Sequence, residues 1–141
     1  MRQYSPMRLI SAAMAILLLV AATAAAGSFD DDLLVLINRY RSTKRLKPLA
    51  ASSLYEDLAR EHSQTMQEQG RMSHDGFEER FRRATDASSC IENVGWNQPT
   101  AQSLFEAWRK SPGHNRNMLE KKIRRSGIAR VGQYTTFFAC Y

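Results

Sequence analysis

The sequence has few of the residues that mark common catalytic or metal-binding motifs. It contains only two cysteines and three histidines in 141 residues, and their spacing matches no recognisable zinc motif. No Gly-x-Ser-x-Gly segment is present, which argues against a serine nucleophile of the hydrolase type. Repeats, low-complexity tracts and internal linkers are also missing, so the length predicts one domain.

Long apolar runs are absent except at the N-terminus, where the sequence has the organisation of a secretory signal. A basic N-terminal segment with Arg2 and Arg8 precedes an apolar run at residues 9–22. Alanines at 24–26 supply the small residues that a signal peptidase needs. The strongly apolar core is nearer a dozen residues than the roughly 20 of a membrane-spanning helix, so a retained anchor is the weaker alternative. We expect residues 1–26 to be a signal peptide and residues 27–141 to be a secreted or periplasmic domain.

Charge of one sign does not dominate the expected mature domain. It has 18 basic and 14 acidic side chains, which gives a net charge of +4. Four of the basic residues crowd into positions 121–125 without the interleaved aromatic side chains that nucleic-acid binding uses. Nucleic acid is therefore not an expected partner, whereas peripheral binding of this cluster to anionic lipid remains an open hypothesis.

Cys90 and Cys140 form the only possible intramolecular disulfide. In an oxidising compartment an even number of cysteines favours a bond, and two free buried thiols are the alternative. Closing a loop of about 50 residues stabilises a fold by about 4 kcal/mol on the chain-entropy model. For a small domain this is a large share of the total stability.

Apolar residues recur at helical spacing in three long segments. These helices are expected at residues 31–44, from Ser52 or Ser53 to Gly70, and after Thr100, which caps the third. Ser53 and Glu56 have the form of a capping box at the start of the second helix. A short helix is expected at residues 77–84, and residues 114–119 form a compact segment of one helical turn.

Three further segments have the character of strands. They are residues 90–96, 127–131 and 134–141, the last two being joined around Gly132. The last strand carries bulky side chains on both faces, which indicates a sheet covered on both sides. The fold class predicted is α/β, an α-β-α sandwich with a small antiparallel sheet between helices.

The three histidines fall into two classes. His62 lies on the apolar stripe of the second helix and is interpreted as a core residue. His74 and His114 lie in loops beside Gly, Asp or Pro, where side chains tend to be exposed. With Glu92 they could form a site for zinc or another divalent cation. A relay of Ser111, His114 and Glu92 could also be assembled, although any small domain offers such a trio.

Six segments, taken in order, resemble the CAP (SCP) superfamily of cysteine-rich secretory and pathogenesis-related proteins. The likeness covers essentially the whole of the expected mature domain and is closest to the short bacterial members. The segments are LINRYR with KPL at 36–49, LAREHSQTM at 58–66, MSH at 72–74, ENVG at 92–95, W with SPGHNRNML at 108–119, and SGIA at 126–129. Each is unspecific alone, and the Ser-Pro-Gly-His segment is the strongest.

The resemblance implies an α-β-α sandwich with a cleft lined by two histidines and two glutamates. Carried over by position, the histidines are His74 and His114, and one glutamate is Glu92. The second acidic position, three residues after Trp108, holds Ser111 in this chain. Losing one carboxylate weakens an acid–base mechanism at a metal-bound water.

The function expected from the sequence is therefore that of a secreted, monomeric, non-catalytic binding module. Its cleft would hold a divalent cation at His74 and His114, or a small polar ligand, and it would engage an envelope, lipid or host component. The alternative is a zinc-assisted hydrolase or protease in which Glu92 positions the attacking water.

Overall fold

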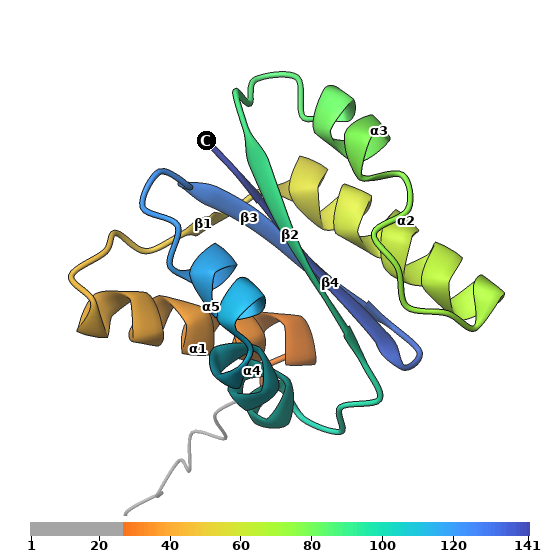
Figure 1. Cartoon of the computed structure of the whole chain (residues 1–141), viewed down its shortest axis with the longest axis horizontal. Helices are drawn as coiled ribbons and strands as arrows, with labels where there is room; N and C mark the ends of the chain where they lie inside the picture. Colours follow the sequence, from red (N-terminus) through yellow and green to blue (C-terminus); the bar gives the residue numbers. More distant parts are fainter. Residues whose placement is uncertain (1–26) are drawn as a thin grey trace, which may run out of the picture.

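A computed structural model describes residues 27–141, and the expected signal peptide lies outside the described residues. A four-stranded sheet is enclosed between two layers of helices (Figure 1). In sheet order the strands are β1 (Ala50–Ala51), β3 (Arg125–Val131), β4 (Tyr134–Cys140) and β2 (Cys90–Trp96). No helix in this part of the chain is long and apolar enough to span a bilayer.

The helices divide between the two faces of the sheet, which confirms the predicted α-β-α sandwich. The helices on one face are α2 (Ser53–Gln69) and α3 (Phe77–Arg83), and those on the other are α1 (Phe29–Thr43), α4 (Ala101–Lys110) and α5 (Pro112–Met118). All three predicted long helices are present.

β4 lies at the centre of the core, between β3 and β2, and every one of its residues is buried. Its side chains alternate between two hydrophobic clusters. Phe137 and Ala139 pack with α1, α4 and α5, whereas Phe138 and Cys140 pack with α2. The prediction of a strand covered on both faces is confirmed.

The sheet is mixed, since β1 runs parallel to β3. Ala50 lies opposite Arg125, and the Ala50 amide donates to the Arg124 carbonyl at 2.9 Å. Two alanines carry no periodic pattern, so the sequence does not predict this short strand.

The predicted capping box at the start of α2 is wrong. Ser52 occupies the N-cap position with an extended backbone and makes no side-chain cap hydrogen bond. Its amide donates instead to the Ser126 carbonyl at 2.9 Å. The helix therefore begins where the pairing of β1 with β3 ends, and Ser53 and Glu56 fall inside the first turn.

Two other helices begin earlier than the sequence predicts. α1 starts at Phe29 because the Ser28 hydroxyl accepts a hydrogen bond from the Asp31 amide at 3.2 Å. α5 starts at Pro112, two residues before the compact segment predicted at residues 114–119. Proline suits a first helical position because the N–H that it lacks would have no partner there.

The Cys90–Cys140 disulfide is present. The two residues lie opposite each other in the antiparallel pair of β2 and β4. The bond thus fastens the edge strand β2 to the central strand of the sheet.

The backbone of α2 approaches β3 closely at Gly127. A Cβ atom on this residue would lie 2.0 Å from the Tyr55 carbonyl carbon and 2.1 Å from the Glu56 nitrogen. Both are backbone atoms of the first turn of α2, so no side-chain rotation can relieve the overlap. Only glycine allows α2 to pack on the sheet at this distance.

Replacing Gly127 by alanine is expected to destabilise the fold. Forcing α2 away from the sheet should cost about 3 kcal/mol or more and lower Tm by roughly 10 °C, measured by thermal unfolding. Gly113→Ala is the matched control, because nothing lies within 4 Å of a Cβ there and alanine favours helix. Similar losses in the two variants would contradict the packing argument.

Candidate functional site

The four predicted site residues line one hollow with a volume of about 370 Å³. His74 lies in the turn between α2 and α3, Glu92 in β2, Ser111 between α4 and α5, and His114 in α5. The rest of the lining consists of Gly113, Arg116 and Asn117.

The hollow forms beside β2 because β2 is an edge strand of the sheet. Asn93 points toward α5, where its side-chain amide donates to the His114 carbonyl at 3.0 Å. Asn117 donates to the backbone carbonyl of Glu92 at 3.0 Å and to the Asn93 side chain at 2.9 Å. These bonds hold α5 against β2, so His114 from one helical layer lies near His74 from the other.

The Glu92 side chain points to the opposite face, where a buried arginine holds its carboxylate. Arg80 of α3 donates from Nε to Oε2 at 2.7 Å and from Nη2 to Oε1 at 2.8 Å. Glu92 and Arg80 are 6% and 7% exposed. The pair is therefore a bidentate, charge-assisted interaction shielded from water.

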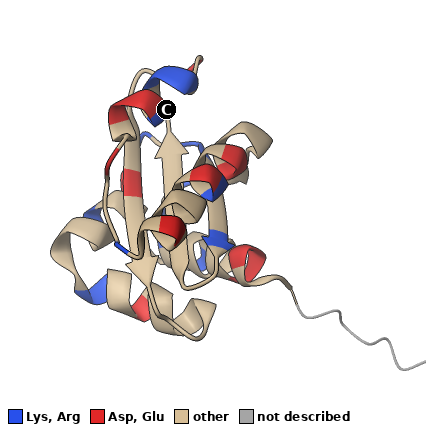
Figure 2. Cartoon of the chain, turned by 90° about the vertical axis from the view of Figure 1, so that its right-hand side faces the viewer, with Lys and Arg blue, Asp and Glu red and all other residues tan. Residues whose placement is uncertain are grey.

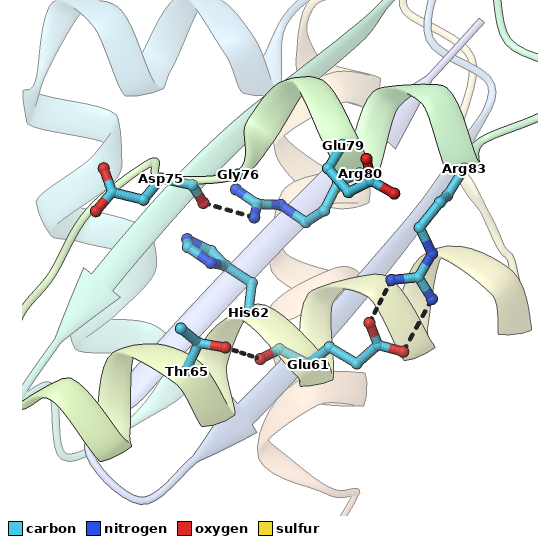
Figure 3. A pocket seen from close by; sticks show the side chains of 8 residues that line it. All are labelled: Glu61, His62, Thr65, Asp75, Gly76, Glu79, Arg80 and Arg83. Carbon is cyan, nitrogen blue, oxygen red and sulfur yellow. Dashed lines mark hydrogen bonds and ion pairs between the residues drawn. The ribbon is translucent and has the colours of Figure 1, made fainter.

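Arg80 is the site residue that the sequence analysis missed. It is one of several arginines in a short helix, and neither periodicity nor spacing distinguishes it from its neighbours. A third hydrogen bond, from Nη1 to the Asp75 carbonyl at 2.8 Å, ties it to the turn that carries His74 (Figure 3).

His74 is oriented by the same carboxylate. Its Nδ1 lies 2.9 Å from Glu92 Oε1, and because an ionised carboxylate only accepts hydrogen bonds, Nδ1 carries the proton. In the neutral ring Nε2 then holds the lone pair. The His74 side chain is 55% exposed, so this nitrogen is accessible to a ligand.

His62 is a core residue, as predicted, but it lies next to the site. It is 4% exposed, and its Nε2–H donates to the Ser73 carbonyl at 2.7 Å. The same nitrogen is 3.8 Å from Glu92 Oε1. His62 and Arg80 lie on facing sides of a second hollow, of about 280 Å³, between α2 and α3 (Figure 3).

Burial favours the neutral form of two of the histidines. Desolvation lowers the pKa of His62, and the neighbouring Glu92 carboxylate offsets this only in part. Desolvation also lowers the pKa of His114, and the charge of His74 lowers it further. Neutral imidazoles are the form that binds metal ions.

The residues do not fit a three-ligand zinc centre. Within residues 27–141, no three His, Cys, Asp or Glu side chains are grouped as metal ligands. Catalytic zinc sites use three protein ligands. Here Glu92 accepts a hydrogen bond from Nδ1 of His74, as an outer carboxylate does in metal sites. Both of its oxygens also accept hydrogen bonds from Arg80.

A third hollow, of about 260 Å³, shares Ser111 and His114 with the first. The exposed side chains of Met72 and Trp96 line it. Trp108 also lines it but is 2% exposed, and its indole N–H donates to the Val94 carbonyl at 3.0 Å. The polar hollow thus continues into a more apolar one.

Replacing Arg80 by methionine is expected to cost about 3–5 kcal/mol of unfolding free energy, because it leaves the Glu92 carboxylate buried without a cation. Urea unfolding measures this. Arg82→Met on the same helix is the control, since Arg82 pairs with Glu79 at the surface and should contribute less than about 1 kcal/mol. Arg80→Met/Glu92→Gln should recover part of the loss, and a failure to do so would contradict a charge-based cost.

Stability should fall as pH decreases from about 7 to 5.5. In this window the unfolded chain takes up a proton on His62 near the ordinary pKa of 6.5, whereas burial opposes protonation in the fold. The slope from one such histidine approaches 1.4 kcal/mol per pH unit, roughly, below the unfolded pKa. Urea unfolding across this range, with a chelator present, should show a shallower slope for His62→Gln. An unchanged slope would contradict the assignment.

Comparison with known proteins identifies the family. The sequence model of the CAP, or cysteine-rich secretory protein, family matches residues 34–141. Comparison with curated protein sequences gave no match.

Solved structures share the fold. An extracellular protein containing an SCP domain from Bacillus anthracis has 23% identity and a TM-score of 0.75, and the match covers 79% of this chain and 40% of that one. A cysteine-rich secretory protein from Staphylococcus aureus has 19% identity and a TM-score of 0.73, with 79% and 38% covered. An outer surface protein from Borrelia burgdorferi has 17% identity and a TM-score of 0.72, with 78% and 90% covered.

The chain spans about two fifths of the length of the first two proteins, and at these identities the likeness extends to the fold alone. The family match, by contrast, covers most of the chain, from the first helix to the last residue. The chain therefore belongs to the CAP family of cysteine-rich secretory proteins.

Proposed function

We propose that this CAP domain is an exported, non-catalytic binding module and that the hollow between His74 and His114 is its ligand site. The observation that carries the proposal is the engagement of Glu92, whose two carboxylate oxygens accept hydrogen bonds from Arg80 and His74. A general base needs a lone pair directed at the proton that it removes. Glu92 directs three of its roughly four lone-pair positions at protein donors instead.

The second acidic position of the family cleft also argues for binding. Ser111 lines the hollow there and supplies a hydroxyl in place of a carboxylate. The alternative of a zinc-assisted hydrolase would require Glu92 to leave Arg80 and position a water molecule. Breaking that buried pair would leave two uncompensated charges, so the geometry favours the binding function.

A divalent cation is the first ligand to test. His74 exposes an imidazole with Nε2 free, and burial favours the neutral form of His114. A cation held by these two rings would keep its other coordination positions for the atoms of a partner. A small polar ligand at the same residues is the second candidate.

Export is supported by the expected signal peptide and by the names of the similar structures, which are described as extracellular, secretory or outer-surface proteins. The partner of the module would then be an envelope, lipid or host component. We expect the module to act as a monomer.

Zinc titration of the purified, processed protein tests the ligand site. One ion should bind per chain, and His74→Ala and His114→Ala should each abolish binding. Glu92→Gln should weaken it about tenfold to a hundredfold, as expected for an outer carboxylate. His62→Gln is the control, because the third histidine does not line the hollow. Zinc binding that persists in both alanine variants would contradict the site, and peptide or ester hydrolysis lost in His114→Ala would favour the enzyme.

A further inference from the structure

Two segments far apart in the sequence bring six exposed basic side chains together at one end of the domain. The connection after α1 and the connection before β3 lie side by side (Figure 1), joined by the hydrogen bond from the Ala50 amide to the Arg124 carbonyl. We call this surface the basic end; it comprises Lys44, Arg45, Lys47, Lys121, Lys122 and Arg124.

A buried arginine beneath the surface holds the two connections together. Arg41 is fully buried, and its Nε donates to the Lys47 carbonyl at 2.9 Å. Its Nη1 donates to the carbonyls of Met118 and Glu120, both at 2.9 Å. All these acceptors are uncharged carbonyl groups, and no carboxylate within residues 27–141 forms an ion pair with the guanidinium. The Glu120 carboxylate acts on it only at longer range. Burial lowers the pKa of Arg41, the nearby charge of Arg124 lowers it further, and the Glu120 carboxylate opposes both effects.

The six side chains of the basic end are not neutralised by ion pairs. None of the ion pairs formed within residues 27–141 includes any of them. Arg125 lies in the same basic run but forms an ion pair with Asp86, so we do not count it as part of the basic end. On the side of the molecule where α2 and α3 lie, by contrast, acidic and basic residues are interspersed (Figure 2).

One of the six side chains is kept at a position that disfavours it. Arg45 has a φ of 58°, in the left-handed region just beyond the end of α1, where glycine is the usual residue. Arg45 is exposed, so its side chain makes no buried contacts that would offset the strain of this backbone conformation.

The shape of the basic end fits a flat anionic surface better than a polymer. None of the five principal hollows among residues 27–141 is lined by any of the six side chains, so none of these hollows gives the basic end a groove for a polymer chain. The nearby rings of Tyr40 and Tyr141 lie beneath the ammonium groups of Lys44 and Lys122, at 5.8 and 5.3 Å. They are not free to stack on nucleic-acid bases, which single-strand binding requires.

We propose that the basic end binds the surface of a membrane containing anionic phospholipids. The contact is electrostatic and peripheral, and it is separate from the hollow at His74 and His114. It leaves that hollow open, since no residue of the basic end lines it. Loss of ligand binding at the hollow would therefore not affect membrane binding by the basic end, and the two proposals can be tested separately.

Sedimentation with lipid vesicles tests the proposal, using the processed protein so that the apolar N-terminal segment does not contribute. The protein should bind vesicles of phosphatidylcholine with phosphatidylglycerol, should not bind phosphatidylcholine alone, and should dissociate as salt rises. Each basic residue near a membrane contributes a factor of about five. Lys44→Gln/Arg45→Gln/Lys47→Gln and Lys121→Gln/Lys122→Gln/Arg124→Gln should each lower the partition coefficient about a hundredfold.

Two controls separate this effect from net charge and from folding. Arg39→Gln/Arg60→Gln/Lys110→Gln removes three exposed charges elsewhere and should lower binding less than about fivefold. Arg45→Gly should weaken vesicle binding while leaving Tm unchanged or raised, because it relieves the strained backbone. His74→Ala/His114→Ala should bind vesicles like the unaltered protein.

Three results would overturn the proposal. The first is an equal loss in the control triple variant, which would indicate net charge alone. The second is vesicle binding that salt does not weaken. The third is binding to a soluble polyanion such as heparin without binding to vesicles, which would assign the basic end to a different partner.

Discussion

The Glu92 carboxylate is buried at the edge of the sheet, and the arrangement of the site follows from the need to hold it there. An uncompensated charge in this position would be strongly destabilising. Arg80 supplies the counter-charge in bidentate geometry, and His74 supplies a third hydrogen bond. Through these bonds one acidic side chain of β2 places both α3 and the turn before it. The same bonds engage the oxygens that a catalytic base would need.

The position of β2 decides where the site can form. As an edge strand it has helical layers on both faces and no strand beyond it, so groups from the two layers can meet only past its free edge. Asn117 satisfies a backbone carbonyl on that edge and keeps α5 close. The Cys90–Cys140 bond fastens the far end of the strand to β4. A rigid edge of this kind suits a binding site whose two imidazoles come from different layers.

Two buried arginines serve the two ends of the domain in different ways. Arg80 is neutralised by Glu92, and the surface near it carries charges of both signs. Within the described residues, Arg41 donates hydrogen bonds only to carbonyl groups, and its Nη2 has no hydrogen-bond partner. Its charge therefore adds to the field of the basic side chains above it. The first arginine builds a polar hollow, and the second supports a positively charged surface.

The sequence by itself determined the elements that depend on neighbouring residues. Apolar periodicity placed the long helices, the two-sided pattern of residues 134–141 required a covered strand, and the count of two cysteines allowed one pairing. The resemblance to CAP domains also selected His74, Glu92, Ser111 and His114, which line one hollow.

Only the tertiary structure decided the partners of those elements. Arg80 looks like its neighbouring arginines until α3 packs over β2, and β1 exists only because β3 lies beside two alanines. Residues 44–47 and 121–124 are likewise joined by Arg41 and not by any local pattern. Periodicity reports the face on which a side chain lies, whereas the groups it meets there depend on how separate elements pack.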